Sequence, residues 1–324
     1  MRIAAATRRT ALAAVALLIA LPAVRADDYP SRPVRLIVGF PPGASADITA
    51  RVLGNRMGQI LGQQIVIENR PGAGSSLAAD YAARAPKDGY TLFLGSSANI
   101  TNQAIFTNLT FDLARDFAPI ARATTAAVIL VVHPSTGVGT VQELIALAKA
   151  KPGEILYAST GVGTAPHLSG ELFGQRAGLK LVHVPYQGSP QAATDLLAGR
   201  VHMMFSPASA VMPNVETGKL TALASAATKR PSIAADIPTM AEAGLPDFDT
   251  SIWFGLMAPA GTPRDIVDKL ARALNEALKS DELIEKLRAQ GFEPLGGTPE
   301  ELAAFIDSEM VKWSAAAQAA GLKK

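Results

Sequence analysis

The sequence predicts an α/β protein whose chain is divided between two lobes. Strand-like and helix-like segments alternate over the length that follows residue 26, which is typical of helices layered on sheets. Several strands run directly into short loops rich in glycine, serine and threonine. Two apolar strands, 128–132 and 253–258, look like crossings from one lobe to the other. A single continuous sheet is the alternative.

The first 26 residues have the features of an export signal. Three early arginines precede an apolar stretch at 11–20, and small residues at 23–26 offer a cleavage site. The apolar stretch is too short to favour a membrane span. We expect export and cleavage after Ala26, with a twin-arginine route left open by the adjacent Arg8 and Arg9.

The mature chain of about 298 residues can bury a large core and is near the size at which chains divide into domains. It keeps 26 basic and 28 acidic residues, a net charge of −2. Because it has no strong basic run, nucleic acid is not an expected partner. The absence of cysteine excludes disulfides, thiol catalysis, cysteine-bound metals and a lipid-anchoring cysteine. We expect a freely diffusing protein without a lipid anchor.

The segment 34–47 begins a series of strand and loop units. Its apolar run 34–38, rich in β-branched residues, predicts a buried parallel strand. A short loop of proline and small residues then opens a helix at 44–47. A helix N-terminus carries free N–H groups and partial positive charge, which suits an anion, although an ordinary capped turn is the alternative. The apolar stripe of this helix is expected at Ile48, Val52, Met57, Ile60 and Leu61.

Four further loops repeat this arrangement, each after a predicted strand. Because strand ends in open α/β sheets meet where ligands bind, the five loops predict one shared cleft. Arg51 lies one turn into its helix and Arg70 precedes Pro71, so no arginine is placed to clamp an anion. Backbone N–H groups, hydroxyls and water would hold it instead. The loops are 68–76 after strand 65–67, 95–99 after 91–94, 158–164 after 155–157, and 186–191 after 181–184.

The two crossings define the expected lobes. Helix starts at Thr262-Pro263 and Thr298-Pro299 predict C-terminal helices that return to the first lobe. Trp253, beside the second crossing, is interpreted either as hinge packing or as a wall of the cleft. The expected first lobe is 27–126 plus 253–324, the second lobe is 127–252, and the hinge lies at about residues 127 and 252.

Motifs for nucleotide, metal or nucleophilic chemistry are missing. The glycines at 161 and 163 lack the third small residue and later acid of a dinucleotide fingerprint. Neither a GxxxxGK[ST] loop nor a GxSxG elbow occurs. The four histidines show no metal-ligand spacing, and His167, in the first turn after 158–164, is equally a candidate for ligand contact and for capping. We therefore expect no metal, no cofactor and no catalytic residue.

At these loops the sequence resembles the Bug-type receptors, which are the TctC-like substrate-binding proteins of tripartite tricarboxylate transporters. The resemblance covers essentially all of the mature chain and implies a two-lobed type II periplasmic binding-protein fold. It also implies a small organic acid in the ligand cleft between the lobes. The motifs that carry it are YPSRPVRLIVGFPPGASAD, LGQQIVIENRPGAGS, PKDGYTLFLG, DFAPIA, YASTGVGTAPHL, HVPYQGSPQA, DLLAGRVHMMF, IPTMAEAG and WFGLMAPAGTP.

The resemblance also implies which residues surround the ligand. First-lobe loops would enclose a carboxylate, often through water, and a second-lobe loop would complete the anion site. Gln187 and Ser206 complete the expected set. The remaining expected residues are Phe40, Gly43, Ala44, Ser45, Asp47, Gly74, Ser75, Ser97, Ala98, Ser159, Thr160, Thr164 and His167.

Departures from the family pattern narrow the range of expected ligands. The family often has an acid where His202 or Ser206 stands, and it usually has more glycine at 44–46. Without that acid an amino acid's ammonium group lacks a partner, so we expect a mono- or dicarboxylate, aromatic ones included. The expected protein is a monomeric periplasmic receptor that delivers this carboxylate to the membrane subunits of a tripartite tricarboxylate transporter. A periplasmic sensor subunit and an enzyme on a related fold are the alternatives.

Overall fold

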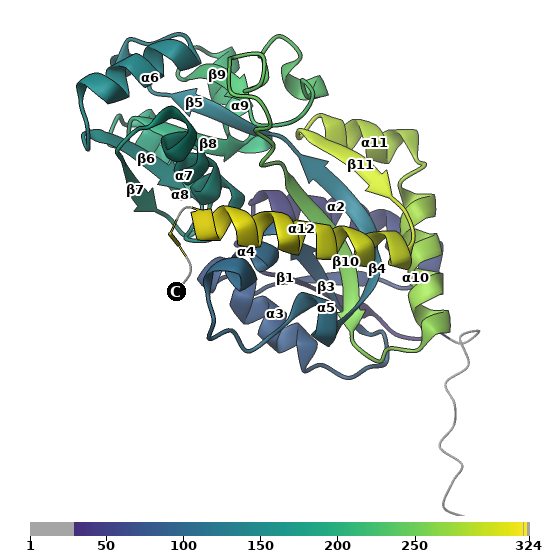
Figure 1. The fold of residues 1–324 in the computed structure, drawn as a ribbon. Coiled ribbons are helices and arrows are strands. Elements are labelled where there is room, and N and C mark those ends of the chain that lie inside the picture. The colour runs from purple at the N-terminus through teal and green to yellow at the C-terminus, as the bar shows by residue number, and fades with distance from the viewer. Residues whose placement is uncertain (1–28, 320, 323–324) are drawn as a thin grey trace, which may run out of the picture.

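The computed structural model of this protein describes residues 29–319 and 321–322. The expected export signal lies outside the described residues. Within that part of the chain, none of the helices has the length and apolar character needed to cross a membrane. The described chain folds into two sheets with helices packed around them (Figure 1).

The first lobe is built on a six-stranded sheet. Strand β1 lies between β2 and β3 and is parallel to both, as its apolar sequence predicts. Strand β10 then pairs antiparallel with β3 and β4, and β4 pairs antiparallel with β11. The strands, in spatial order, are β11 (Phe292–Gly296), β4 (Phe117–Ala126), β10 (Ile252–Pro259), β3 (Thr91–Ser96), β1 (Val34–Val38) and β2 (Ile65–Asn69).

The second lobe is built on a separate five-stranded sheet. Strand β6 is parallel to β7 and β8, whereas β5 is antiparallel to β8 and β9. The strands, in spatial order, are β7 (Leu181–Pro185), β6 (Ile155–Ser159), β8 (Met203–Pro207), β5 (Val128–Val132) and β9 (Thr221–Ser225). Two separate sheets confirm the two-lobed α/β prediction, and the alternative of one continuous sheet is wrong.

The chain passes between the sheets twice. Ala127 alone separates β4 from β5, and the return follows Thr250 into β10. The two passages lie side by side, because the Thr250 N–H donates to Ala226 O at 2.9 Å and the Ala226 N–H donates to Val128 O at 2.8 Å. Figure 1 shows β4 and β10 extending from the lower sheet toward the upper one. This adjacency is the geometry that a two-segment hinge requires.

Helices cover both faces of the first sheet. Strand alternation sends Leu36 and Val38 into one core and Ile37 into the other. Helices α2, α10 and α11 lie on the Leu36 face, while α3, α4, α5 and α12 lie on the Ile37 face. Their bounds are α2 (Ser45–Leu61), α3 (Ser76–Ala83), α4 (Ser97–Ile105), α5 (Leu113–Asp116), α10 (Arg264–Ala277), α11 (Asp281–Arg288) and α12 (Pro299–Ala319).

The second lobe has four helices among its described residues, and short 3-10 turns occur in both lobes. The Thr140 hydroxyl accepts from the Glu143 N–H at 3.2 Å, and the Glu143 carboxylate accepts from the Thr140 N–H at 3.2 Å, which is a capping box at the start of α6. The remaining bounds are α6 (Val141–Ala150), α7 (Ala165–Ala177), α8 (Ser189–Leu197), α9 (Ala208–Glu216), η2 (Ala73–Ser75), η3 (Pro134–Thr136) and η4 (Ser232–Ala234).

Helix α2 turns most of the predicted apolar stripe toward the core, because Met57 is buried and Ile48, Val52 and Leu61 are partly buried against it. Ile60 is 37% exposed, whereas small residues of the helix are buried against β2. A Cβ at Gly54 would lie 3.2 Å from Ile67, and one at Gly58 would lie 3.1 Å from the Gln63 carbonyl. The close approach of α2 to β2 therefore determines which residues of α2 are buried. It also positions the N-terminus of α2 near the end of β1.

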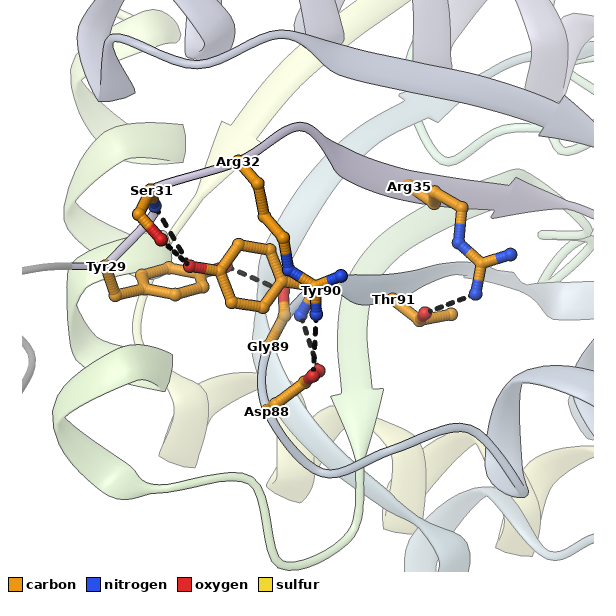
Figure 2. A network of polar contacts seen from close by, with 8 residues as sticks. All are labelled: Tyr29, Ser31, Arg32, Arg35, Asp88, Gly89, Tyr90 and Thr91. Carbon is orange, nitrogen blue, oxygen red and sulfur yellow. Dashed lines mark hydrogen bonds and ion pairs between the residues drawn. The ribbon is translucent and has the colours of Figure 1, made fainter. Parts of the chain in front are cut away.

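A polar network fastens the first described residues to the turn before β3 (Figure 2). The buried Tyr29 donates its hydroxyl to Gly89 O at 2.7 Å, and its ring meets Tyr90 edge-on at 5.1 Å. Arg32 pairs with Asp88 at 3.1 Å and lies over the Tyr90 ring. This network holds the segment that leads into β1. The loop at 39–44, between β1 and α2, is called the first cleft loop.

Candidate ligand-binding cleft

Five helices start at one small cavity between the lobes, which we call the inner cavity. It has a volume of about 40 Å³. The first lobe contributes the starts of α2 and α4, and the second lobe contributes those of α7, α8 and α9. The lining residues are Phe40, Ala44, Ser45, Ala46, Ser96, Ser97, Ala98, Thr160, Thr164, Ala165, Pro166, Ser189, Pro207, Ile252 and Phe254.

The electrostatics of the inner cavity come from backbone dipoles. None of the described residues that line it has a charged side chain. Among the described residues, no side-chain cap closes the N-terminus of α2, α7, α8 or α9. Such helix ends present partial positive charge and backbone N–H groups that lack an intrahelical acceptor. Serine and threonine hydroxyls add donors, so the inner cavity favours an anion.

A larger space adjoins the inner cavity, and we call it the outer chamber. It has a volume of about 670 Å³ and is lined from both lobes. Phe40 and Thr160 line both spaces. The remaining lining residues of the outer chamber are Gly39, Pro71, Gly72, Ala73, Gly74, Ser75, Ser76, Phe106, Asn108, Leu109, Gly161, Val162, Pro185, Tyr186 and Gln187.

Asp47 holds the first cleft loop in place through hydrogen bonds. Its buried carboxylate accepts from the Gly43 N–H at 3.0 Å, from Arg51 Nε at 2.9 Å and from Asn69 Nδ2 at 2.9 Å. Asn69 also donates to Phe40 O at 2.9 Å. Burial acts to raise the pKa of Asp47, but these hydrogen bonds outweigh it and lower the pKa. Asp47 therefore holds the loop that Phe40 and Gly43 belong to.

Two histidines brace the second-lobe loop at 159–164. Gly163 N–H donates to His167 Nδ1 at 3.1 Å, and Ser159 Oγ lies 2.7 Å from His183 Nε2. The two rings stack with centroids 4.1 Å apart. Burial, with the neighbouring His167, lowers the pKa of His183 to about 4, so its ring is neutral at pH 7. The hydrogen bond from the Gly163 N–H makes His167 a support of the 159–164 loop.

The lobes touch across the cleft. The Thr101 hydroxyl donates to the Gly163 carbonyl, which joins α4 of the first lobe to the 159–164 loop of the second. A Cβ added at Gly163 would lie 2.1 Å from Asn102 Oδ1. Farther along the cleft, a Cβ at Gly188 would lie 3.2 Å from Pro41 Cγ. Glycines therefore permit the close approach of the two lobes.

The expected site residues divide into three groups. Gly43, Asp47, Ser159, His167 and Ser206 line neither space, and the contacts above show that at least Asp47, Ser159 and His167 support loops. Gly74, Ser75 and Gln187 line the outer chamber. Phe40, Ala44, Ser45, Ser97, Ala98, Thr160 and Thr164 line the inner cavity.

Sequence reasoning missed the wall formed by β10. Ile252 and Phe254 line the inner cavity, while Trp253 between them faces the other way and donates its ring N–H to Glu309 at 2.9 Å. Of the two interpretations of Trp253, packing is therefore correct for this cavity. Period-two alternation next to the crossing is the signal that identifies its neighbours. Ser189 also lines the inner cavity and was not among the expected residues, although its place before Pro190 at a helix start is a signal that could have identified it.

The fold and the cleft together define a two-lobed solute-binding protein. Residues 49–322 match the family model of the tripartite tricarboxylate transporter family receptor, TctC. The chain belongs to this family, as its sequence motifs predict. The family match also confirms the prediction of a receptor for a solute.

Three solved structures are similar over nearly the whole chain. The R. palustris protein Rpa4515 with adipate is 37% identical with a TM-score of 0.87, over 91% of this chain and 99% of that one. The periplasmic binding protein BugD is 31% identical with a TM-score of 0.86, over 91% and 100%. MatC from Rhodopseudomonas palustris with bound malate is 32% identical with a TM-score of 0.84, over 89% and 99%. These similarities confirm the two-lobed fold and the Bug-type resemblance.

Proposed function

We propose that this protein captures a small organic carboxylate between its lobes and delivers it to the membrane subunits of a tripartite tricarboxylate transporter. The observation that carries the proposal is the meeting of five helix starts at the inner cavity, whose described lining residues include no charged side chain. Backbone N–H groups and hydroxyls stabilise an anion there, and each hydrogen bond to the charged group contributes about 1.5–3 kcal/mol.

The same lining argues against cations and amino acids as ligands. An ammonium group would have no carboxylate among the described lining residues and would face the positive ends of five helices. Similar proteins support the assignment, because one solved relative holds adipate and another holds malate. Mono- and dicarboxylates, aromatic ones included, are therefore the proposed ligand class.

We further propose that the lobes close by bending at about residues 127 and 252, with lobes of 27–126 plus 253–324 and 127–252. The side-by-side passages between the sheets support this hinge. The protein is proposed to act as a periplasmic monomer, cleaved after Ala26, without a lipid anchor. It is proposed not to be an enzyme. A serine that is hydrogen-bonded to a histidine can act as a nucleophile, and Ser159 and His183 form such a pair. Neither side chain lines the inner cavity or the outer chamber, so the pair has no access to a ligand bound there, which supports the proposal.

A thermal-shift screen tests the ligand class. A ligand present at about 100 times its dissociation constant adds about 2.7 kcal/mol to the free energy of unfolding, which shifts the melting temperature measurably. Mono-, di- and aromatic carboxylates should stabilise the protein, and their matched neutral amides should not. Thr160→Val, which removes one hydroxyl from the inner cavity, should weaken the best carboxylate by about 1–3 kcal/mol. Equal stabilisation by amides would refute the carboxylate assignment.

Uptake of the labelled ligand tests the transport role. A strain that lacks this receptor should lose uptake of the carboxylate found in the screen, and a plasmid copy should restore it. Unchanged uptake in the deletion strain would overturn delivery to a transporter and would favour the sensor role.

A further inference from the structure

The inner cavity is too small to hold an organic acid longer than acetate. A buried water needs about 10–15 Å³ measured in this way, so 40 Å³ gives room for roughly three or four non-hydrogen atoms. A carboxylate with one attached carbon already fills that room. Any longer ligand must therefore extend beyond the inner cavity while its carboxylate faces the helix starts.

The outer chamber is the space into which such a ligand can extend. Phe40 and Thr160 line both spaces, so the two adjoin at these side chains. At about 670 Å³ the outer chamber falls within the range of small-molecule sites. Its walls come from the first lobe at Phe106 and Leu109 and from the second lobe at Val162 and Tyr186. A ligand tail in this chamber would contact both lobes.

The chemistry of the outer chamber differs from that of the inner cavity. Among the described residues that line it, none is charged, and only one helix, α3, starts there. Several backbone donors on its wall already have protein acceptors. Ser75 N–H donates to Gly72 O at 3.0 Å, Gly161 N–H to Ser159 Oγ at 3.1 Å and Tyr186 N–H to Ser159 O at 3.0 Å.

A charged group in contact with a wall residue is also neutralised. The Tyr186 hydroxyl donates to Asp195 at 2.7 Å, and Asp195 pairs with Arg200 at 2.7 Å. Aromatic and aliphatic surfaces dominate the rest of the wall, including Val162, which is 43% exposed. The exposed Asn108 and Gln187 amides can meet a neutral polar substituent.

We propose that the preferred ligand is a monocarboxylate whose uncharged aliphatic or aromatic tail occupies the outer chamber. This inference rests on the proposed function and makes it more specific. A second carboxylate in the outer chamber would lose water without gaining a cation or a group of open helix starts. The chamber therefore selects against a dicarboxylate of the same length.

Calorimetric titration with acetate, hexanoate and adipate tests this proposal. Each buried methylene strengthens binding roughly fourfold, so hexanoate should bind at least about tenfold more tightly than acetate. Adipate, which has the same six-carbon chain with a second carboxylate, should bind more weakly than hexanoate. Val162→Lys places a cation at the outer chamber and should raise the affinity for adipate relative to hexanoate. Val182→Lys, also on an exposed valine of the second lobe, is the matched control and should change neither.

The outcomes separate this proposal from the proposed function. Acetate binding as tightly as hexanoate would show that the tail does not use the outer chamber. Adipate binding as tightly as hexanoate would overturn the uncharged tail and leave carboxylate binding intact. If none of the three acids binds while a neutral solute does, the proposed function itself is wrong.

Discussion

Gly163→Ala should trap the protein in an open form. Gly163 has a φ of +79°, in the left-handed region, and its missing side chain leaves room for Asn102 of the other lobe. Gly153 has the same φ of +79° with no atom within 4 Å of an added Cβ, so Gly153→Ala is a matched control. Both variants carry a backbone penalty of about 1 kcal/mol, and only Gly163→Ala adds a clash between the lobes.

The magnitude of the clash follows from the contacts of Asn102. An added Cβ would lie 2.1 Å from Asn102 Oδ1, so that side chain must move. Its amide nitrogen donates to Ala73 O at 3.1 Å, to Gly74 O at 2.9 Å and to Ser76 Oγ at 2.9 Å. The amide has two hydrogens to share among these three acceptors, so at 0.5–1.5 kcal/mol for each N–H the closed form loses about 1–3 kcal/mol. Ligand affinity should therefore fall roughly five- to 150-fold.

Solution scattering and calorimetry measure the two consequences. The wild type and Gly153→Ala should show a smaller radius of gyration when saturated with the best carboxylate from the screen. Gly163→Ala should bind that carboxylate more weakly and should stay expanded at concentrations that saturate the control. If Gly163→Ala binds and contracts as the control does, then the approach of Gly163 to Asn102 is not part of the ligand-bound form, and Gly163 is not required for the lobes to close.

Three further predictions concern stability. Asp47→Asn should lower the free energy of unfolding at pH 7 by about 1–3 kcal/mol in urea titrations, since the carboxylate binds Arg51, and unchanged stability would refute its bracing role. Folding lowers the pKa of His183 from 6.5 to about 4, so at falling pH the unfolded chain takes up a proton at this residue before the folded protein does. The free energy of unfolding should therefore keep its full value above pH 6.5 and should fall by at most roughly 3 kcal/mol as the pH is lowered toward 4. His183→Gln should flatten that part of the pH profile. Glu309→Leu should destabilise the protein by about 2 kcal/mol or more, seen as a lower melting temperature, because two tryptophan N–H groups lose their acceptor.

The local signals in the sequence predicted the fold well because they match its physical requirements. The run at 34–38 is buried on both faces and forms a parallel strand, and the 128–132 segment forms β5 with the predicted bounds. Four of the five residues predicted for the apolar stripe of α2 pack against the core, and Ile60 is the exception, because glycines at positions 54 and 58 bring small residues against the sheet. Hydrophobic periodicity does not register such close backbone packing.

The candidate site was predictable as a set of loops but not as individual side chains. Ser45 and Thr160 line the inner cavity, as their places at helix starts suggest. Whether Asp47 faces the cavity or supports the loop depends on Asn69, which is distant in sequence. Ile252 and Phe254 reach the cavity through strand pairing across the whole chain, and no local pattern encodes that pairing.

The six-stranded sheet draws its strands from both ends of the chain, and the whole five-stranded sheet lies between β4 and β10 in the sequence. During synthesis and export, the second lobe is therefore complete before the first can be. β10, the central partner of β3 and β4, and the helices α10 and α12 emerge last. A chain that ends before residue 252 would leave the first lobe without its middle strand, while residues 128–225 would still contain every strand of the second sheet. The protein is thus most vulnerable to truncation at the end farthest in sequence from its first cleft loop.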